Sequence, residues 1–97
     1  MELKIIRVEL HGATTEEDYN NLHAYMERNG WKRQIFPNAP GATGGPINLP
    51  TAMYCGDSDQ SSANIAEGLR IGINAEVWTN CIVLVMGVGT NWAIRWN

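Results

Sequence analysis

An α+β domain built from two strand–helix–strand halves is the fold that this sequence predicts. Alternating apolar residues before Gly12, a capped amphipathic pattern after it and a stop at Gly30 make up the first half. A second amphipathic pattern, followed by the apolar run at residues 81–86, makes up the other half. Periods of 2 and 3.6 residues distinguish strands from helices. The expected order is therefore strand, helix, strand, strand, helix, strand, strand.

The first strand and the first helix have the clearest local signals. The strand, which ends at residues 11–12, has three alternating apolar residues on one face: Ile6, Val8 and Leu10. Thr14 and Glu17 form a capping-box pattern that starts the helix, and the acidic first turn suits the positive helix end. The apolar stripe of this helix recurs at i, i+3, i+4 and i+7: Tyr19, Leu22, His23 and Met26. Gly30 is expected to end the helix as a left-handed cap.

The middle of the chain predicts two strands separated by a long loop. Residues 31–36 favour a second strand. Residues 37–46 contain three Gly and three Pro in ten residues, a composition that fits neither a helix nor a sheet interior. Residues 47–55 favour a third strand, which Pro50 weakens because it has no N–H to donate.

The second helix is well capped but weak in its middle. Residues 56–59 supply turn and N-cap chemistry before the apolar stripe Ile65, Ala66, Leu69 and Ile73. Gly68 and Gly72 each cost about 1 kcal/mol relative to Ala in a helix interior. The helix therefore either packs very close to the sheet or frays after Leu69, and Asn74 is expected to stop it.

The end of the chain predicts two further strands. Residues 77–86 contain a near-continuous apolar run, which is typical of a strand covered on both faces, so we expect it to be the most buried strand. Residues 90–96 place Trp92, Ile94 and Trp96 on one face of a last strand.

Together these elements predict a split βαβ, or ferredoxin-like, antiparallel sheet in a single domain of residues 1–97, with both helices on one face and a fifth, C-terminal strand. The first and third strands are expected at its centre. This topology is expected to make His11, Thr14 and Thr15 neighbours of the loop at residues 37–46. It also separates Cys55 from Cys81 by the width of one strand, so we expect both thiols to stay free.

Composition excludes several classes of protein. Ten acidic and seven basic residues give a net charge of −3 with no run of either sign, which argues against tight nonspecific binding of nucleic acid. The start of the chain lacks the pattern of a signal peptide, and no apolar run is long enough to span a bilayer, so a cytoplasmic protein is expected. The two cysteines have no metal-ligand spacing, and residues 41–45 lack the Lys-Ser/Thr ending of a phosphate loop. We therefore expect no metal and no small-molecule cofactor.

Four short motifs resemble a known family. They are Val8-Glu-Leu-His-Gly-Ala13, Asp18-Tyr-x-x-Leu-His-x-x-Met26, Gly30-Trp-x-Arg33 and Leu49-Pro-x-Ala-x-Tyr54. This pattern, which covers about the first fifty-five residues, is similar to small proteobacterial and prophage proteins grouped with GhoS, the endoribonuclease antitoxin of type V toxin–antitoxin systems. The resemblance implies a ferredoxin-like fold, dimerisation through the sheet and cleavage of a partner messenger RNA. Related CRISPR-associated nucleases carry a metal-binding Asp where this chain has Glu9 and His11, so metal-free cleavage is expected here.

A metal-free ribonuclease needs acid–base groups and a cation for the phosphorane. His11 and Arg33 are the candidate catalytic residues. Trp31 and Tyr54 are candidate faces for stacking RNA bases, and Thr14 and Thr15 are candidate RNA contacts beside His11.

Each candidate also has a purely structural interpretation. His11 can be a hydrogen-bonded turn residue, Arg33 a solvated surface charge, and Trp31 and Tyr54 core aromatics. His23 lies on the apolar stripe, so we expect it to be packed, neutral and hydrogen-bonded.

The alternative function is a non-catalytic regulator or inhibitor that works by protein contact. For either function we expect a homodimer built around the C-terminal strand, because three large apolar side chains there need a surface to pack on. The competing expectation is that this segment folds back onto its own core.

Overall fold

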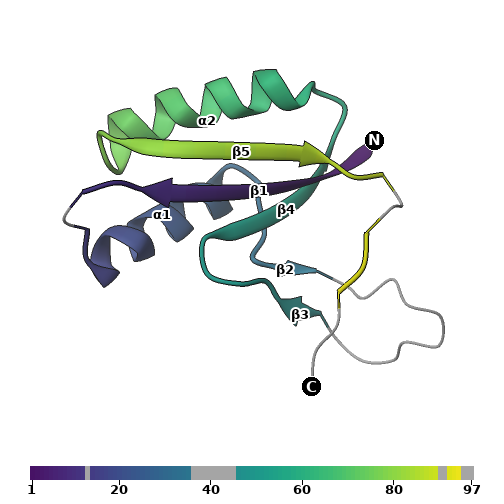
Figure 1. Cartoon of the computed structure of the whole chain (residues 1–97), viewed down its shortest axis with the longest axis horizontal. Helices are drawn as coiled ribbons and strands as arrows, with labels where there is room; N and C mark the ends of the chain where they lie inside the picture. The colour runs from purple at the N-terminus through teal and green to yellow at the C-terminus, as the bar shows by residue number, and fades with distance from the viewer. Residues whose placement is uncertain (13, 36–45, 90–91, 95–97) are drawn as a thin grey trace.

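The computed structural model describes residues 1–12, 14–35, 46–89 and 92–94, and shows an α+β fold (Figure 1). Its elements in chain order are β1 (Glu2–Leu10), α1 (Glu16–Arg28), β2 (Gln34–Ile35), β3 (Ile47–Asn48), β4 (Met53–Ser58), α2 (Ser62–Glu76) and β5 (Cys81–Gly87).

β1 is the central strand of the main sheet, which has the order β4-β1-β5. Both of its neighbours run antiparallel to it, with Ile5 opposite Cys55 on β4 and Val8 opposite Val83 on β5. β2 and β3 pair with each other in a small second sheet. An isolated antiparallel bridge between Lys32 and Cys55 connects the chain just before β2 to β4.

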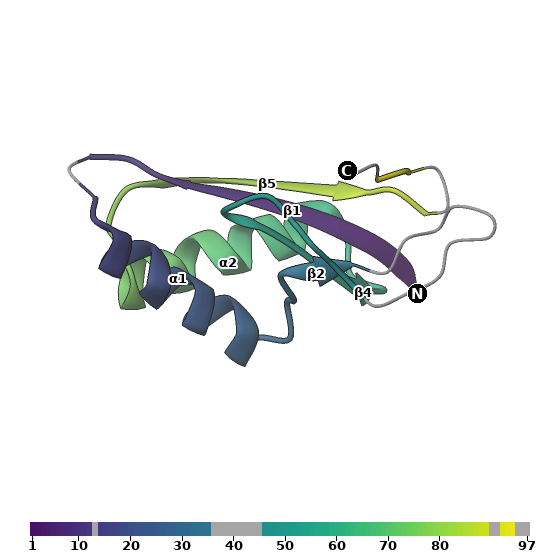
Figure 2. The same cartoon turned by 90° about the horizontal axis from the view of Figure 1, so that it is seen from below.

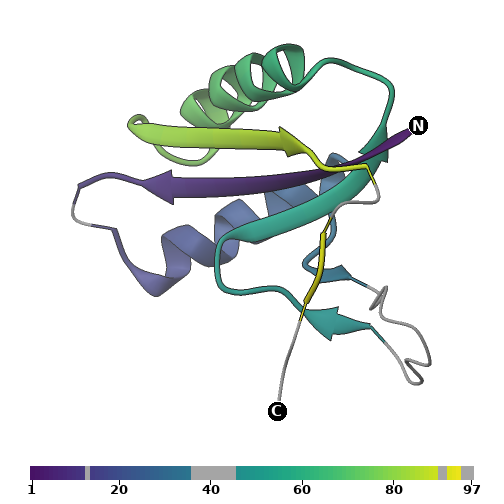
Figure 3. The same ribbon diagram turned by 45° about the vertical axis from the view of Figure 1, so that its right-hand side comes forward.

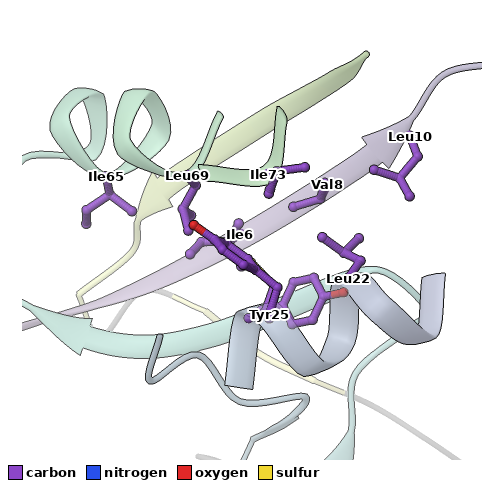
Figure 4. Packing of buried hydrophobic residues seen from close by; sticks show 10 residues of the cluster. Ile6, Val8, Leu10, Leu22, Tyr25, Ile65, Leu69 and Ile73 are labelled. Carbon is purple, nitrogen blue, oxygen red and sulfur yellow. The ribbon is translucent and has the colours of Figure 1, made fainter. Parts of the chain in front are cut away.

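Both helices cover the same face of the main sheet (Figure 2). Ile6 and Val8 of β1 point toward this layer, where Leu22 and Tyr25 of α1 meet Ile65, Leu69 and Ile73 of α2 (Figure 4). The alternation of the first strand is therefore confirmed, because its apolar residues are the ones that the helices cover.

The first helix begins one residue later than the sequence pattern predicted. Thr15, rather than Thr14, is the N-cap, and Asp18, rather than Glu17, completes the capping box. The backbone N–H of Thr14 instead donates to the carbonyl of Gly12, at 2.9 Å, in a turn that the positive φ of Gly12 permits. At the other end Gly30 has a φ of 88°, as expected of a left-handed helix stop.

The predicted second and third strands are shorter than expected. Within residues 31–35 only Gln34 and Ile35 form a strand, and the prediction for residue 36 lies outside the described residues. The third strand is broken into β3 and β4 by a turn in which the N–H of Met53 donates to the carbonyl of Pro50, and Ala52 takes a φ of 64°. Pro50 therefore ends pairing instead of weakening a continuous strand.

The second helix starts and ends later than predicted. Asp57 and Ser58 belong to β4, where they pair with the start of β1, and Ser61 is the N-cap. The helix passes through Asn74 to Glu76, so that the predicted stop and the fraying after Leu69 are both wrong. Close packing explains its persistence, because a Cβ at Gly72 would collide with the hydroxyl of Tyr25 on α1.

The prediction that residues 77–86 form the most buried strand is wrong. β5 begins only at Cys81 and, within the described residues, pairs on one side alone, with β1. Its three outward-facing side chains are substantially exposed: Ile82 by 55%, Leu84 by 49% and Met86 by 41%. Val83 and Val85 face the helices, so the apolar run has one covered face and one open face.

The C-terminal segment does not form the predicted strand where it is described. Residues 92–94 are not part of a strand, and they lie on the side of the sheet away from the helices (Figure 2), as the turned view in Figure 3 also allows the reader to follow. Trp92 and Ile94 line a cavity with Ile5, Ile35 and Met53 of the same chain. The described part of the segment thus folds back onto its own chain.

Cys55 and Cys81 are both free and lie on the two strands that flank β1, as expected. Burial raises the pKa of each thiol above its ordinary value, which makes both less reactive. None of the described helices has the length and apolar character needed to cross a lipid bilayer.

Candidate functional site: a basic groove after the first helix

The turn after α1 places three chemically distinct side chains in a row. Gly30 reverses the chain, and the N–H of Trp31 then donates to the carbonyl of Met26, at 3.0 Å. Lys32 exchanges two backbone hydrogen bonds with Cys55 of β4, at 2.8 and 2.9 Å. Because the turn is anchored to both α1 and β4, the positions of Trp31, Lys32 and Arg33 are fixed by the fold.

A cavity of about 430 Å³ opens beside this turn, and we call it the basic groove. Its lining residues are Glu27, Lys32, Arg33, Gln34, Asn48 and Leu49. Among these described residues the two cations outnumber the one carboxylate. The Gln34 amide donates to Oδ1 of Asn48 at 2.9 Å across the β2–β3 pair. Guanidinium, ammonium and amide groups together suit the oxygens of a phosphate.

A buried polar pair lies close to Arg33. A hydrogen bond of 2.7 Å joins Nδ1 of His23 to the hydroxyl of Tyr54, and the two side chains are 8% and 0% exposed. Burial first, and the charge of Arg33 second, lower the pKa of His23, whereas Glu27 raises it. Burial raises the pKa of Tyr54 far above its ordinary value, against the opposing effect of Arg33. The expectation of a packed, hydrogen-bonded His23 is confirmed.

His11 lies at the other end of α1, directly after β1. Its Nε2 lies 3.1 Å from Oε1 of Glu9, and its side chain is 36% exposed. Its backbone is held on both sides, because its N–H donates to Asn80 at 2.8 Å and its carbonyl accepts from Nε1 of Trp78 at 2.6 Å. The structure thus fixes the His11 backbone while leaving its ring accessible beside a carboxylate, which is a suitable arrangement for acid–base chemistry.

The surroundings of His11 are acidic. Glu16, Glu17 and Asp18 form the first turn of α1, next to the predicted RNA contacts Thr14 and Thr15. The Thr15 hydroxyl is already engaged in the capping box with Asp18. Positive charge for a phosphate is therefore found at the basic groove and not among these neighbours of His11.

The structure does not bring His11 and Arg33 together. They lie beyond opposite ends of α1, whose thirteen residues span about 20 Å. The predicted loop partner of His11 lies mostly outside the described residues, and Pro46, its last residue, lines a cavity with Leu3 at the start of β1. One phosphate group cannot contact His11 and Arg33 at the same time.

The two candidate stacking residues differ in access. Tyr54 has no exposed surface, so its ring offers no face to a base. Trp31 is half-buried, lies against Gly56 and lines a separate cavity between the helices.

Five of the described lining residues of the basic groove were not predicted as site residues: Glu27, Lys32, Gln34, Asn48 and Leu49. A usable signal was present, because Lys32 and Arg33 are adjacent cations immediately after a helix stop. Asn48 lines the groove because β3 pairs with β2, from which it is separated in sequence by residues 36–45. No local sequence pattern predicts that pairing.

Within the described ranges, no three His, Cys, Asp or Glu side chains come together as metal ligands. The chain finds no match in comparisons with protein-family models, with curated proteins or with solved structures.

Proposed function

We propose that this chain is a GhoS-like antitoxin endoribonuclease that holds single-stranded RNA in the basic groove and uses His11 for acid–base chemistry. The observation that carries the proposal is the presence of Lys32 and Arg33 together in one cavity, whose other described lining residues are Glu27, Gln34, Asn48 and Leu49. Residues of the family motifs gather at this place, because Arg33 and Leu49 line the groove and the buried pair of His23 and Tyr54 lies beside Arg33.

The same proposal includes the finer ferredoxin-like arrangement of the sheet. Its support is the order β4-β1-β5, in which both neighbours run antiparallel to β1. The bridge between Lys32 and Cys55 supports β2 as the next strand beyond β4. In that interpretation β3 is a short extra strand that does not belong to the ferredoxin-like core. The order of the remaining elements, β1-α1-β2-β4-α2-β5, is that of the split βαβ fold.

Cleavage in this proposal is attack of a ribose 2′-hydroxyl on the adjacent phosphorus. His11 takes the hydroxyl proton, and Glu9 stabilises the resulting imidazolium. Water protonates the departing 5′-oxygen, and the imidazolium returns its proton to the hydroxide that this leaves. The products are a 2′,3′-cyclic phosphate and a 5′-hydroxyl end. Because His11 and the basic groove lie at opposite ends of α1, the bound strand runs along this helix and the two sites contact different nucleotides.

Binding and cleavage are tested with labelled single-stranded RNA in the presence and absence of chelator. Arg33→Gln is expected to weaken RNA binding about tenfold. It should also reduce the slope of the logarithm of the binding constant against the logarithm of salt concentration by about one. Arg7→Gln is the matched control, because it removes the same charge from an exposed site on β1. His11→Ala is expected to slow cleavage by about 10²- to 10⁴-fold without weakening binding.

Three results would count against this function. Equal losses in Arg33→Gln and Arg7→Gln would show that net charge, and not the groove, attracts RNA. Unchanged cleavage by His11→Ala would remove His11 from the reaction. Absence of RNA binding and cleavage would favour the second candidate.

The second candidate is a non-catalytic module that binds another protein. The exposed apolar row of β5, formed by Ile82, Leu84 and Met86, supports it, because monomeric proteins seldom gather large apolar side chains on an uncovered sheet face. A pull-down from a bacterial lysate, with and without ribonuclease treatment, separates the two functions. Proteins that stay bound after RNA digestion support direct protein contact, and their loss supports an RNA-centred role.

A further inference from the structure

A second cavity, of about 520 Å³, lies between the end of α1 and the first half of α2. We call it the interhelix cavity. Its lining residues are Tyr25, Asn29, Gly30, Trp31, Asp57, Ser58, Gln60, Asn64, Ile65, Gly68 and Leu69. Its size is within the range of small-molecule sites.

Gly68 has no packing reason to be glycine. It lies in the interior of α2, where glycine is disfavoured relative to alanine. A Cβ built there meets nothing within 4 Å, whereas one at Gly72 would collide with Tyr25. Asn64, Gly68 and Gly72 recur every four residues and so form one stripe of the helix. Gly72 thus permits close contact with α1, while Gly68 leaves space in the cavity.

The walls of the interhelix cavity suit a flat, uncharged group with hydrogen-bonding edges. Trp31 is held in place because its ring lies against the backbone of Gly56, where an added Cβ would be 2.7 Å from Cε3. Within the described residues, the side-chain amides of Gln60 and Asn64 have no hydrogen-bond partner, so they are available to a ligand. Among the described residues of the lining, Asp57 is the one carboxylate and there is no Lys or Arg, which disfavours a phosphate.

We infer that the interhelix cavity binds one unpaired nucleobase, stacked on Trp31 and held at its edge by Asn64 and Gln60. This inference rests on the proposed RNA function and names a base subsite for it. Trp31 and Lys32 are adjacent in the chain but line different cavities, so a base on one side of the turn and a phosphate on the other are contacts that neighbouring parts of one strand can make. Single-stranded RNA is typically recognised in this way, by stacking and by hydrogen bonds to base edges.

The test uses free ribonucleosides, which carry no phosphate and so do not depend on the basic groove. The full chain is titrated with adenosine, guanosine, cytidine and uridine while the indole N–H signal of Trp31, assigned with Trp31→Phe, is followed by NMR. At least one nucleoside is expected to give a saturable shift of this signal and of the Gly68 amide. Ribose 5-phosphate is expected to give neither shift.

Gly68→Ala supplies the sharper test, because its effects on binding and on stability have opposite signs. The added methyl occupies the cavity and is expected to weaken nucleoside binding about tenfold. It is also expected to increase the folding constant about fivefold, which corresponds to about 1 kcal/mol of helix propensity. Gly72→Ala is the contrasting variant, since its collision with Tyr25 lowers stability. Asn64→Ala leaves the cavity open and tests the amide alone.

The outcomes distinguish this inference from the function on which it rests. Unchanged nucleoside affinity in Gly68→Ala, or no saturable shift with any nucleoside, overturns the base subsite. Oligonucleotide binding that still depends on Arg33 would then leave the proposed function standing. Nucleoside binding without any RNA binding or cleavage supports the base subsite and contradicts the proposed RNA function. Saturation by N-acetyl-arginine amide but not by nucleosides would assign the cavity to a protein side chain beside Asp57, and would also overturn the inference.

Discussion

Tyr54 is the largest of the side chains that have essentially no exposure, and its hydroxyl is the partner of His23. At the scale of single residues, this pair connects the first helix to β4 directly beside the candidate RNA groove. An unpaired polar group at such a site would be costly, because no water replaces the lost hydrogen bond. The pair therefore supports the groove without being reachable by a ligand.

Removal of the Tyr54 hydroxyl is expected to destabilise the protein. Tyr54→Phe leaves Nδ1 of the buried His23 without its partner, so the free energy of unfolding should fall by about 1–3 kcal/mol in urea titrations. The double variant Tyr54→Phe with His23→Leu removes both polar groups and should recover part of that loss. If the loss of unfolding free energy in the double variant equals the sum of the losses in the two single variants, the hydrogen bond contributes nothing.

The lowered pKa of His23 predicts a loss of stability at acid pH. Burial and Arg33 lower it below the ordinary 6.5, so the unfolded chain takes up a proton more readily than the folded chain. This contribution is fully present above pH 6.5 and is lost as the pH falls from there through the folded-state pKa. Urea unfolding measured from pH 7.5 to 5 should show a decline in the wild type that His23→Gln reduces. His11→Gln is the control and should retain the decline.

At the scale of elements, the start of α1 shows how two equally good local patterns are separated. Thr14 with Glu17 and Thr15 with Asp18 both fit a capping box. The turn at Gly12 uses the backbone N–H of Thr14 and delivers Thr15 to the N-cap position. Because β1 and the packed face of α1 fix both ends of this turn, tertiary contacts choose the cap.

The two threonines provide a matched pair for testing this choice. Thr15→Ala loses the capping box and should lower the free energy of unfolding by about 1 kcal/mol. Thr14→Ala removes a hydroxyl for which the described residues show no hydrogen bond, and should change stability by less than about 0.5 kcal/mol. Chemical denaturation of both variants is the measurement, and a larger effect at Thr14 would contradict the observed cap.

At the scale of the whole molecule, the sheet has a covered face and an open face. The helices cover one side, and residues 92–94 lie against part of the other. Within the described residues β5 is an edge strand, and its row of Ile82, Leu84 and Met86 is exposed. An edge of this kind can pair with a second copy about a two-fold axis, so a homodimer remains our prediction, with β5 as a second candidate surface in addition to the C-terminal segment.

Self-association through β5 is tested by Leu84→Lys. A charge in the middle of the row should weaken dimerisation about tenfold or more, equal to about 1.4 kcal/mol, as measured by sedimentation equilibrium. Ile71→Lys is the control, because Ile71 is 56% exposed but lies on α2. A dimer that survives Leu84→Lys but not removal of residues 90–97 would place the interface at the C-terminal segment. A wild-type monomer would exclude both.

The elements themselves were largely readable from the sequence, because local periodicity and turn chemistry act within a few residues. The alternation of Ile6, Val8 and Leu10, the stop at Gly30 and the stripe of Ile65, Leu69 and Ile73 all hold in the structure. Arg33 and Trp31, which the sequence named as candidates, each line a cavity, and their roles stay predictions.

Tertiary structure alone decided what lies beside what. The apolar run of β5 is compatible with a central strand and with an edge strand. Among the described residues β5 pairs only with β1, and Leu84 lies exposed on the face that the helices do not cover. The pairing of β3 with β2 brings Asn48 into the same cavity as Arg33, and the packing of the two helices brings Asn64 into the same cavity as Trp31. These contacts join residues far apart in the chain, where the competing burial and pairing of the whole fold, and not local preference, set the position of each side chain.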